Sequence, residues 1–213
     1  MRSSMAGLSV GLVVLVLSSG AYGQAITART RVTSELIGPN GKVTSSHIRD
    51  GVYYRTSAGD TLTRYTTMDG NPTTGELAWA TMRKNGVSYQ LDYATHRAYV
   101  SSFPPFTPPN PPKAPGAPEQ SSVEGIPCNI VPSYRMNAGT LTRVGSTCYS
   151  ERYKLVLRTD VTITSPDGRS AYSVIEMYAI QIGLEPDPNL FDLRHNFTVY
   201  RPDAAEPSPG NNK

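Results

Sequence analysis

The chain has 213 residues, with 20 basic against 17 acidic side chains and a formal net charge of +3. Such a small and scattered excess lacks the clustered basic stripe of a nucleic-acid-binding protein, so we expect no nucleic-acid partner. Two cysteines and three scattered histidines show no ligand spacing, so we expect no metal and no cofactor.

The amino terminus has the pattern of a signal peptide. Arg2 precedes an apolar run from Gly7 to Leu17, and small residues stand at Ala21 and Gly23. A helix of that length spans roughly 16 Å, about half of a bilayer core, so the run is not an ordinary membrane span. We expect cleavage after Gly23 and export of a soluble product to the periplasm or the extracellular space. The alternative is a buried core helix over these residues.

Strand signals dominate the chain after residue 23. Threonine, valine, tyrosine and isoleucine are abundant, and turn dipeptides of the hairpin type occur at Asn40-Gly41, Asp50-Gly51, Asp69-Gly70, Asn85-Gly86 and Asp167-Gly168. The first half therefore predicts a meander of strands over residues 26–36, 42–49, 52–56, 61–67, 76–83, 87–92 and 97–101. Trp79 is the expected core anchor of this half.

A proline-rich segment interrupts the strands at residues 103–122. Residues 104–118 contain eight prolines, which lack the amide donor that a sheet requires and favour extended polyproline geometry. We expect an exposed, semi-rigid loop in the middle of the domain. It serves either as a spacer between two halves of a sheet or as a docking site for a protein partner.

The second half resumes the strand pattern, over residues 123–134, 139–150, 153–163, 170–182 and 197–200. Alternating apolar residues from Tyr153 to Ile163 predict a strand with one buried face. In the return strand, 170–182, both parities carry apolar side chains, and its inward side stays open. We expect a turn at residues 185–191 and a disordered polar tail at residues 204–213.

Cys128 and Cys148 are the two cysteines of the chain. An exported protein meets an oxidising compartment, which favours a disulfide between them, and the alternative is two free thiols.

Motifs of known catalytic sites are absent from the sequence. We find no Gly-x-Ser-x-Gly, no His-Glu-x-x-His, no glycine-rich phosphate loop and no Cys-x-x-Cys. Asp69-Gly70-Asn71 begins like a calcium loop, but Pro72 follows and the later ligand spacing fails. We therefore expect a protein that is not an enzyme.

Three segments resemble a group of uncharacterised exported bacterial proteins. Residues 51–64 resemble their Tyr-Arg-Asp-Ser-x-Gly-Arg-x-Arg stretch, and residues 86–98 resemble their Tyr-x-Leu-Asp-Pro-x-Thr hairpin. Residues 185–191 resemble their closing Pro-Asp-Pro-x-Leu-Phe motif, which is also similar to that of carriers of the LolA, LolB and LppX type. The resemblance implies a curved antiparallel half-barrel that holds acyl chains. The sequence shows no amphipathic helix of the kind that plugs the half-barrel of LolA.

Together these features predict a mainly β fold: a single curved antiparallel sheet or half-barrel over residues 24–203, with the proline-rich loop in its middle. The expected function is a non-enzymatic envelope protein that binds an apolar or lipid-like ligand on the concave face. The alternatives are an interaction module that uses the proline-rich loop, and a hydrolase with an unrecognised site. The candidate lining, whose members would equally serve as core, is Trp79, Tyr89, Leu91, Leu155, Leu157 and Ile163.

Overall fold

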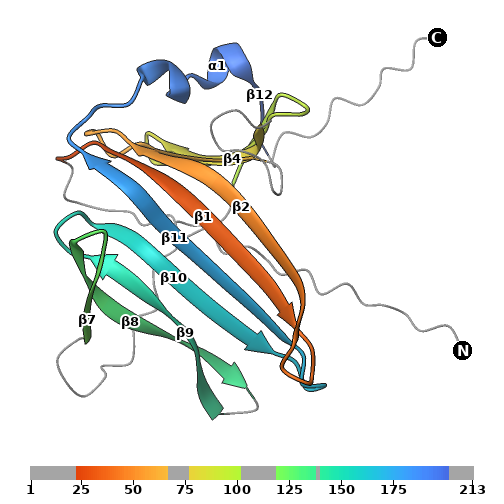
Figure 1. The fold of residues 1–213 in the computed structure, drawn as a ribbon. Helices are drawn as coiled ribbons and strands as arrows, with labels where there is room; N and C mark the ends of the chain where they lie inside the picture. Colours follow the sequence, from red (N-terminus) through yellow and green to blue (C-terminus); the bar gives the residue numbers. More distant parts are fainter. Residues whose placement is uncertain (1–22, 67–76, 102–118, 138–139, 202–213) are drawn as a thin grey trace, which may run out of the picture.

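The computed structural model describes residues 23–66, 77–101, 119–137 and 140–201. Twelve strands of this part form a single sheet (Figure 1). They are β1 (Ile26–Ile37), β2 (Val43–Arg55), β3 (Thr61–Thr66), β4 (Leu77–Lys84), β5 (Val87–Asp92), β6 (Arg97–Val100), β7 (Glu119–Val123), β8 (Ile126–Asn137), β9 (Thr140–Ser150), β10 (Leu155–Thr164), β11 (Ser170–Ile182) and β12 (Thr198–Tyr200). A short 3-10 helix, η1 (Pro188–Phe191), and a helical turn, α1 (Leu193–Asn196), precede β12.

The sheet consists of two meanders joined at its centre. Its order is β12-β6-β5-β4-β3-β2-β1-β11-β10-β9-β8-β7, so β1 pairs with β11 where the two meanders meet. The predicted mainly β fold with a single curved sheet is confirmed. The prediction of a wholly antiparallel sheet is wrong at one edge, because β12 pairs with β6 in parallel. The chain reaches β12 from η1 and α1 instead of from a hairpin, which permits the parallel direction.

Most of the predicted turns in the described residues are present. Asn85 and Gly86, with φ of 51° and 79°, join β4 to β5 in the left-handed region that tight hairpins require. A turn that the sequence analysis missed joins β7 to β8 at Glu124 and Gly125. Asp69-Gly70 lies outside the described residues.

Asp50-Gly51 is not a turn, contrary to expectation. Both residues lie within β2, which runs unbroken from Val43 to Arg55. A Cβ atom at position 51 would lie 2.7 Å from Thr30 Oγ1 and would also collide with the carbonyl oxygen of Arg64. The glycine is therefore needed for the close approach of β1, β2 and β3 and not for a change of direction.

The predicted proline-rich loop, residues 103–122, extends too far at its carboxyl end. Residues 119–122, which contain no proline, belong to β7 and pair with β8. The rest of that segment, residues 1–22 of the predicted signal peptide and the predicted polar tail lie outside the described residues. The predicted turn at residues 185–191 contains η1, whose first amides are capped by Asp187: its carboxylate accepts a hydrogen bond of 2.9 Å from Asn189 N.

One apolar cluster lies between β3–β6 and the carboxyl-terminal helices. We expected no helix to cover the sheet, yet η1 and α1 do so over this part (Figure 1). They are too short to show an amphipathic period in the sequence. The members of this cluster are Leu62, Ala80, Met82, Leu91, Ala98, Phe191 and Leu193.

A second cluster, the disulfide cluster, shows that the sheet is curved. It contains Ile26, Cys128, Cys148, Leu155 and Leu157, with Tyr53, Met177 and Ile180 among the side chains packed against it. Tyr53 belongs to β2 and Cys128 to β8, which are not neighbours in the sheet, so the face that carries them must curve towards itself. We call it the inner face. Ile26, Ala28, Thr30 and Val32 alternate onto it along β1.

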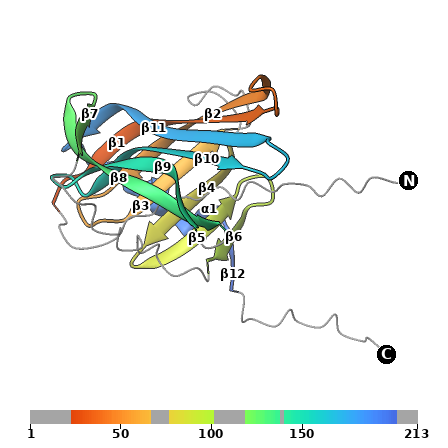
Figure 2. The same ribbon diagram turned by 90° about the horizontal axis from the view of Figure 1, so that it is seen from below.

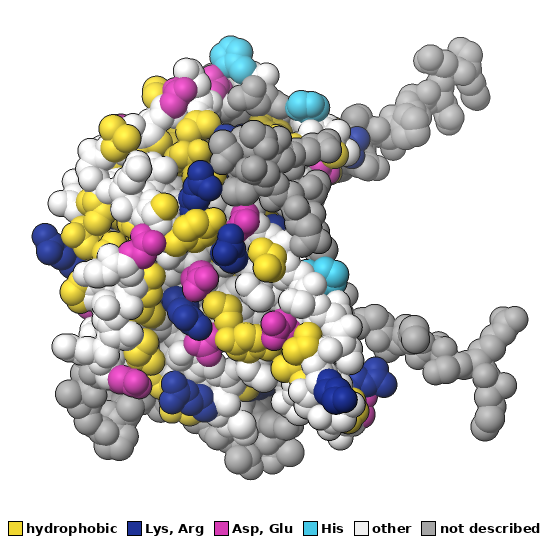
Figure 3. Space-filling model, viewed as in Figure 1, with side chains coloured by type: hydrophobic (Ala, Val, Ile, Leu, Met, Phe, Trp, Pro, Cys, Tyr) yellow, Lys and Arg dark blue, Asp and Glu magenta, His cyan; other side chains and the backbone are white. Residues whose placement is uncertain are grey.

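The opposite, outer face of the central strands carries a ladder of alternating charges. Asp50, Arg31, Glu176 and Arg158 occupy paired positions on β2, β1, β11 and β10. Arg31 Nε lies 2.9 Å from Asp50 Oδ1, and Arg158 Nη1 lies 3.9 Å from Glu176 Oε2. Figure 3 shows basic and acidic side chains interspersed across this face, and Figure 2 shows the same strands from below. The outer face is therefore a solvated surface with balanced charge.

Candidate binding site on the inner face

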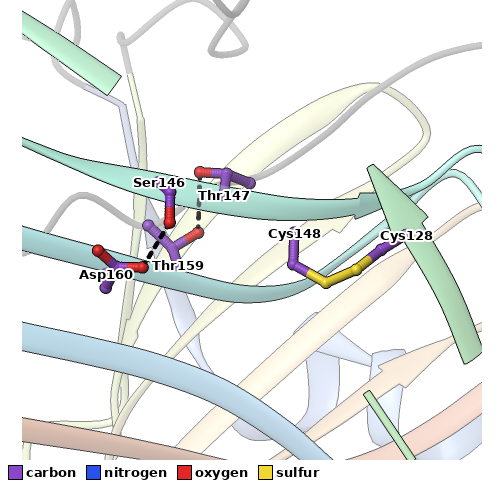
Figure 4. The surroundings of a disulfide bond; sticks show 6 residues. All are labelled: Cys128, Ser146, Thr147, Cys148, Thr159 and Asp160. Carbon is purple, nitrogen blue, oxygen red and sulfur yellow. Dashed lines mark hydrogen bonds between the residues drawn. A yellow bond between two sulfur atoms is a disulfide. The ribbon is translucent and has the colours of Figure 1, made fainter. Parts of the chain in front are cut away.

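The end of the inner face near Ile26 is filled and tied together. A disulfide joins Cys128 on β8 to Cys148 on β9, with Cα atoms 5.4 Å apart, as predicted (Figure 4). Arg55 reaches across the curve from β2, where its Nη1 donates a hydrogen bond of 2.7 Å to the carbonyl oxygen of Tyr153. Its Nη2 donates to the carbonyl oxygen of Gln24 at 3.3 Å. Any site on this face must therefore lie beyond the disulfide cluster.

Side chains on β9 and β10 fix the two strands beside the disulfide. Ser146 Oγ donates to Asp160 Oδ1 at 2.6 Å, and the hydroxyl oxygens of Thr147 and Thr159 lie 3.2 Å apart (Figure 4). Together with the disulfide, these contacts hold β8, β9 and β10 as one wall of the curved sheet.

Beyond the disulfide cluster, a row of inner-face side chains crosses the four central strands. Arg49 on β2 pairs with Val32 on β1, Val32 pairs with Ile175 on β11, and Ile175 pairs with Thr159 on β10. Directly paired residues of adjacent strands share a face, so the row forms a continuous strip. Val32 is buried and Ile175 is half-buried, yet neither belongs to either apolar cluster. A parallel row at the far end contains Leu36, Ala171 and Ile163.

An aromatic pair stands at the β2–β4 end of this strip. The rings of Tyr65 and Trp79 stack with centroids 4.5 Å apart, and the Arg49 guanidinium carbon lies 5.9 Å from the centre of the Trp79 ring. Tyr65 packs against Gly51 and is 3% exposed, whereas Trp79 and Arg49 are half-buried. Burial raises the pKa of Tyr65 to about 12, and the nearby positive charge of Arg49 opposes part of that rise.

Three buried polar atoms near the inner face have no hydrogen-bond partner in the described part of the chain. They are Thr30 Oγ1, Arg49 Nε and Ser150 Oγ. Thr30 lies beneath Tyr65, beside Gly51, and is 2% exposed. Unpartnered polar atoms are costly in a folded protein, so they mark places where an acceptor or a donor is missing.

The structure places the predicted lining residues on both faces. Trp79 and Ile163 lie on the inner face, and Leu155 and Leu157 lie within the disulfide cluster. Tyr89 and Leu91 lie on the outer side of β5, packed under η1 and α1, because Leu91 pairs with Ala80 and not with Trp79. The six residues are therefore not one lining.

Sequence reasoning missed Arg49, Tyr65, Val32 and Ile175. Each stood in a predicted strand, but alternation along one strand does not say which residues of other strands share its face. The stacked Tyr65–Trp79 pair needed the β3–β4 register, which the local sequence does not encode.

No group of three or more His, Cys, Asp or Glu side chains in the described residues is placed to hold a metal ion. None of the helices in this part has the length and apolar character to cross a membrane. His195 Nδ1 lies 2.6 Å from Asp192 Oδ2 on the exposed side of α1, away from the inner face.

Comparison with known proteins finds similarity among solved structures. No family model and no curated protein matches the chain. A DUF1329 family protein from Desulfovibrio piger is 10% identical, with a TM-score of 0.34, over 80% of this chain and 90% of its own. A LolA superfamily protein from Nitrosomonas europaea is 9% identical, with a TM-score of 0.32, over 78% and 89%. A putative outer membrane lipoprotein-sorting protein domain from Vibrio parahaemolyticus is 9% identical, with a TM-score of 0.30, over 83% and 91%.

Proposed function

We propose that this chain is an exported, non-enzymatic protein of the cell envelope that binds an apolar or lipid-like ligand on the inner face of its sheet. The observation that carries the proposal is the strip from Arg49 to Thr159, which turns apolar side chains into the curve of the sheet outside both apolar clusters. A curved sheet must cover such a face with protein or with a ligand.

Two features support export. The disulfide belongs to an oxidising compartment, and residues 1–23 have the signal-peptide pattern. Expression of the full chain in an exporting bacterium should yield a mature protein that begins at Gln24. Amino-terminal sequencing of the exported fraction tests this, and a protein that still begins at Met1 would contradict it.

The single tryptophan of the chain provides a built-in reporter of binding. Trp79 lies on the inner face, so a bound acyl chain should change its emission in a saturable manner, with a dissociation constant in the micromolar range. Titration with dodecanol and with dodecanoate tests this. The burial of apolar surface should also give a negative heat-capacity change in calorimetry. The absence of both signals with both probes would overturn the proposal.

Neighbouring positions on β10 offer a matched pair of variants. Ile163→Gln places an amide on the inner face, whereas Thr162→Gln places the same group on the outer face. We expect the first to weaken dodecanol binding severalfold and the second to leave it unchanged. Equal weakening by both variants would place the ligand elsewhere. Thermal unfolding of both proteins controls for loss of the fold.

A further inference from the structure

We propose that Arg49, which lies over the Trp79 ring, binds the negatively charged head of the ligand, so that the inner face selects anionic amphiphiles over neutral ones of the same chain length. This inference rests on the proposed function and specifies the chemistry of its ligand. The occupant is an amphiphile with one acyl chain and a carboxylate head.

The Arg49 side chain has a buried donor without an acceptor. It is half-buried, and its Nε is buried without a hydrogen-bond partner in the described residues. Its acidic neighbour in the chain, Asp50, points to the outer face and pairs there with Arg31. A buried donor without an acceptor is costly, and an anionic ligand would supply the acceptor that Nε lacks.

Aromatic contacts hold the Arg49 guanidinium in place before a ligand binds. The cation–π contact with the Trp79 ring, which itself stacks on the buried Tyr65, limits the orientations of the Arg49 side chain. A planar guanidinium held in this way presents its donors as a fork, which matches the two oxygens of a carboxylate. Arg64 shows a similar contact with the Tyr93 ring, at 5.8 Å, and its Nε is likewise buried without a partner in the described residues, but it lies on the opposite face of the sheet.

Arg49 is continuous with the apolar side chains of the strip. Val32 is the direct cross-strand partner of Arg49, and Ile175 follows on the next strand. Adjacent strands lie about 4.8 Å apart, so the strip from Arg49 to Thr159 extends about 15 Å from the charge. An amphiphile whose head contacts Arg49 would therefore lay its chain across β1, β11 and β10, over the half-buried Ile175, with the buried Val32 and Thr159 beneath it.

The test compares dodecanoate with dodecanol, which share a chain length and differ in charge. The native protein should bind dodecanoate about tenfold more tightly, since one charge-assisted contact contributes about that factor. Arg49→Gln should abolish this preference by weakening dodecanoate binding about tenfold. Arg64→Gln, the matched control on the outer face, should preserve it.

The outcomes separate this inference from the proposed function. Failure of both probes to bind the native protein overturns both. Equal binding of the two probes to the native protein, or a preference that survives Arg49→Gln, overturns the charge selection alone and leaves the apolar site standing.

A second measurement uses only the native protein, in case Arg49→Gln does not fold. Bromine quenches tryptophan at short range, so fatty acids brominated near the carboxylate or near the methyl end report which end lies beside Trp79. We expect stronger quenching by the head-proximal bromine. Stronger quenching by the methyl-end bromine would overturn the proposal.

Discussion

The Nζ atom of Lys84 donates a hydrogen bond of 2.8 Å to the carbonyl oxygen of Phe191, which joins the end of β4 to the end of η1. Phe191 itself is buried between η1 and β3–β6. The polar contact and the apolar one hold the same short helix against the sheet. The packing of the outer cluster therefore depends on residues about one hundred positions apart in the chain.

Phe191→Ala should lower the free energy of unfolding by about 3–5 kcal/mol, because it empties the space beneath η1. Lys84→Met should cost about 1–2 kcal/mol, because the Phe191 carbonyl loses its donor while the aliphatic stem is kept. Urea denaturation measures both values. Leu184→Ala is the control, since Leu184 is 64% exposed, and it should change stability by less than about 0.5 kcal/mol. A similar cost for all three variants would contradict the cover role of η1.

Gly51→Ala should destabilise the protein by at least about 1–3 kcal/mol, although alanine is normally a better strand residue than glycine. The added methyl group would meet Thr30 Oγ1 and the Arg64 carbonyl oxygen, and the carbonyl, which belongs to the backbone of β3, cannot move without separating strands. Thermal denaturation with Ser46→Ala as a control, an exposed position on the same strand, measures the effect. A neutral Gly51→Ala would mean that Gly51 is a dispensable residue of the strand.

Replacing Cys128 and Cys148 by serine should remove about 3 kcal/mol, since the bond closes a loop with a sequence separation of 20. For a domain of this size, that corresponds to a fall in Tm of about 6–12 °C. The same fall should follow reduction of the native protein, and the reductant should not affect the double variant. If the reductant also lowers the Tm of the double variant, the fall in Tm does not come from loss of the disulfide.

Alkaline pH should unfold the protein as buried tyrosines ionise. Burial raises the pKa of Tyr53 and Tyr65 from 10.0 to about 12 in the folded state. Because the pKa of each tyrosine is higher in the folded protein than in the unfolded chain, folding favours the neutral phenol. The resulting stability is complete below about pH 10 and is lost as the pH rises towards 12. Tyr65→Phe should therefore shift the alkaline unfolding midpoint to higher pH, whereas Tyr134→Phe, at an exposed position, should not. The appearance of tyrosinate absorbance near 295 nm follows the transition. An unshifted midpoint in Tyr65→Phe would contradict the sign of this linkage.

The sequence predicted individual strands well because strands are local patterns. The strands at residues 87–92 and 170–182 have the expected bounds, since turn residues or a change in composition mark their ends. The sequence did not indicate which side of the strand at residues 170–182 faces inward. Its register with β1 shifts between Thr27 and Arg29, and Ala179 there has a positive φ of 50°. This bulge lets Met177 and Ile180, of opposite parity, both pack against the disulfide cluster.

The candidate site was much less predictable, because it depends on register between strands. Trp79 and Leu91 seemed equivalent as apolar strand residues, yet the β4–β5 pairing puts them on opposite faces. Arg49 looked like an ordinary charged strand residue, because the Trp79 ring that it contacts lies two strands away in the sheet. Interactions of this kind are set by the assembled sheet and leave no periodic trace in the chain.

The pairing of β1 with β11 also governs the order in which the molecule can be assembled. Residues that pair between the two strands lie far apart in the chain, by 133 positions for Ile37 and Ser170 and by 156 positions for Ile26 and Ile182. Each meander can form from hairpins as it leaves a ribosome or a translocation pore, but β1 keeps one unpaired edge until β11 has emerged. During that interval the nascent chain offers an open strand edge to any other chain nearby. Its yield during export should therefore depend on a chaperone that shields β1, and it should fall most steeply when synthesis is slowed between β6 and β11.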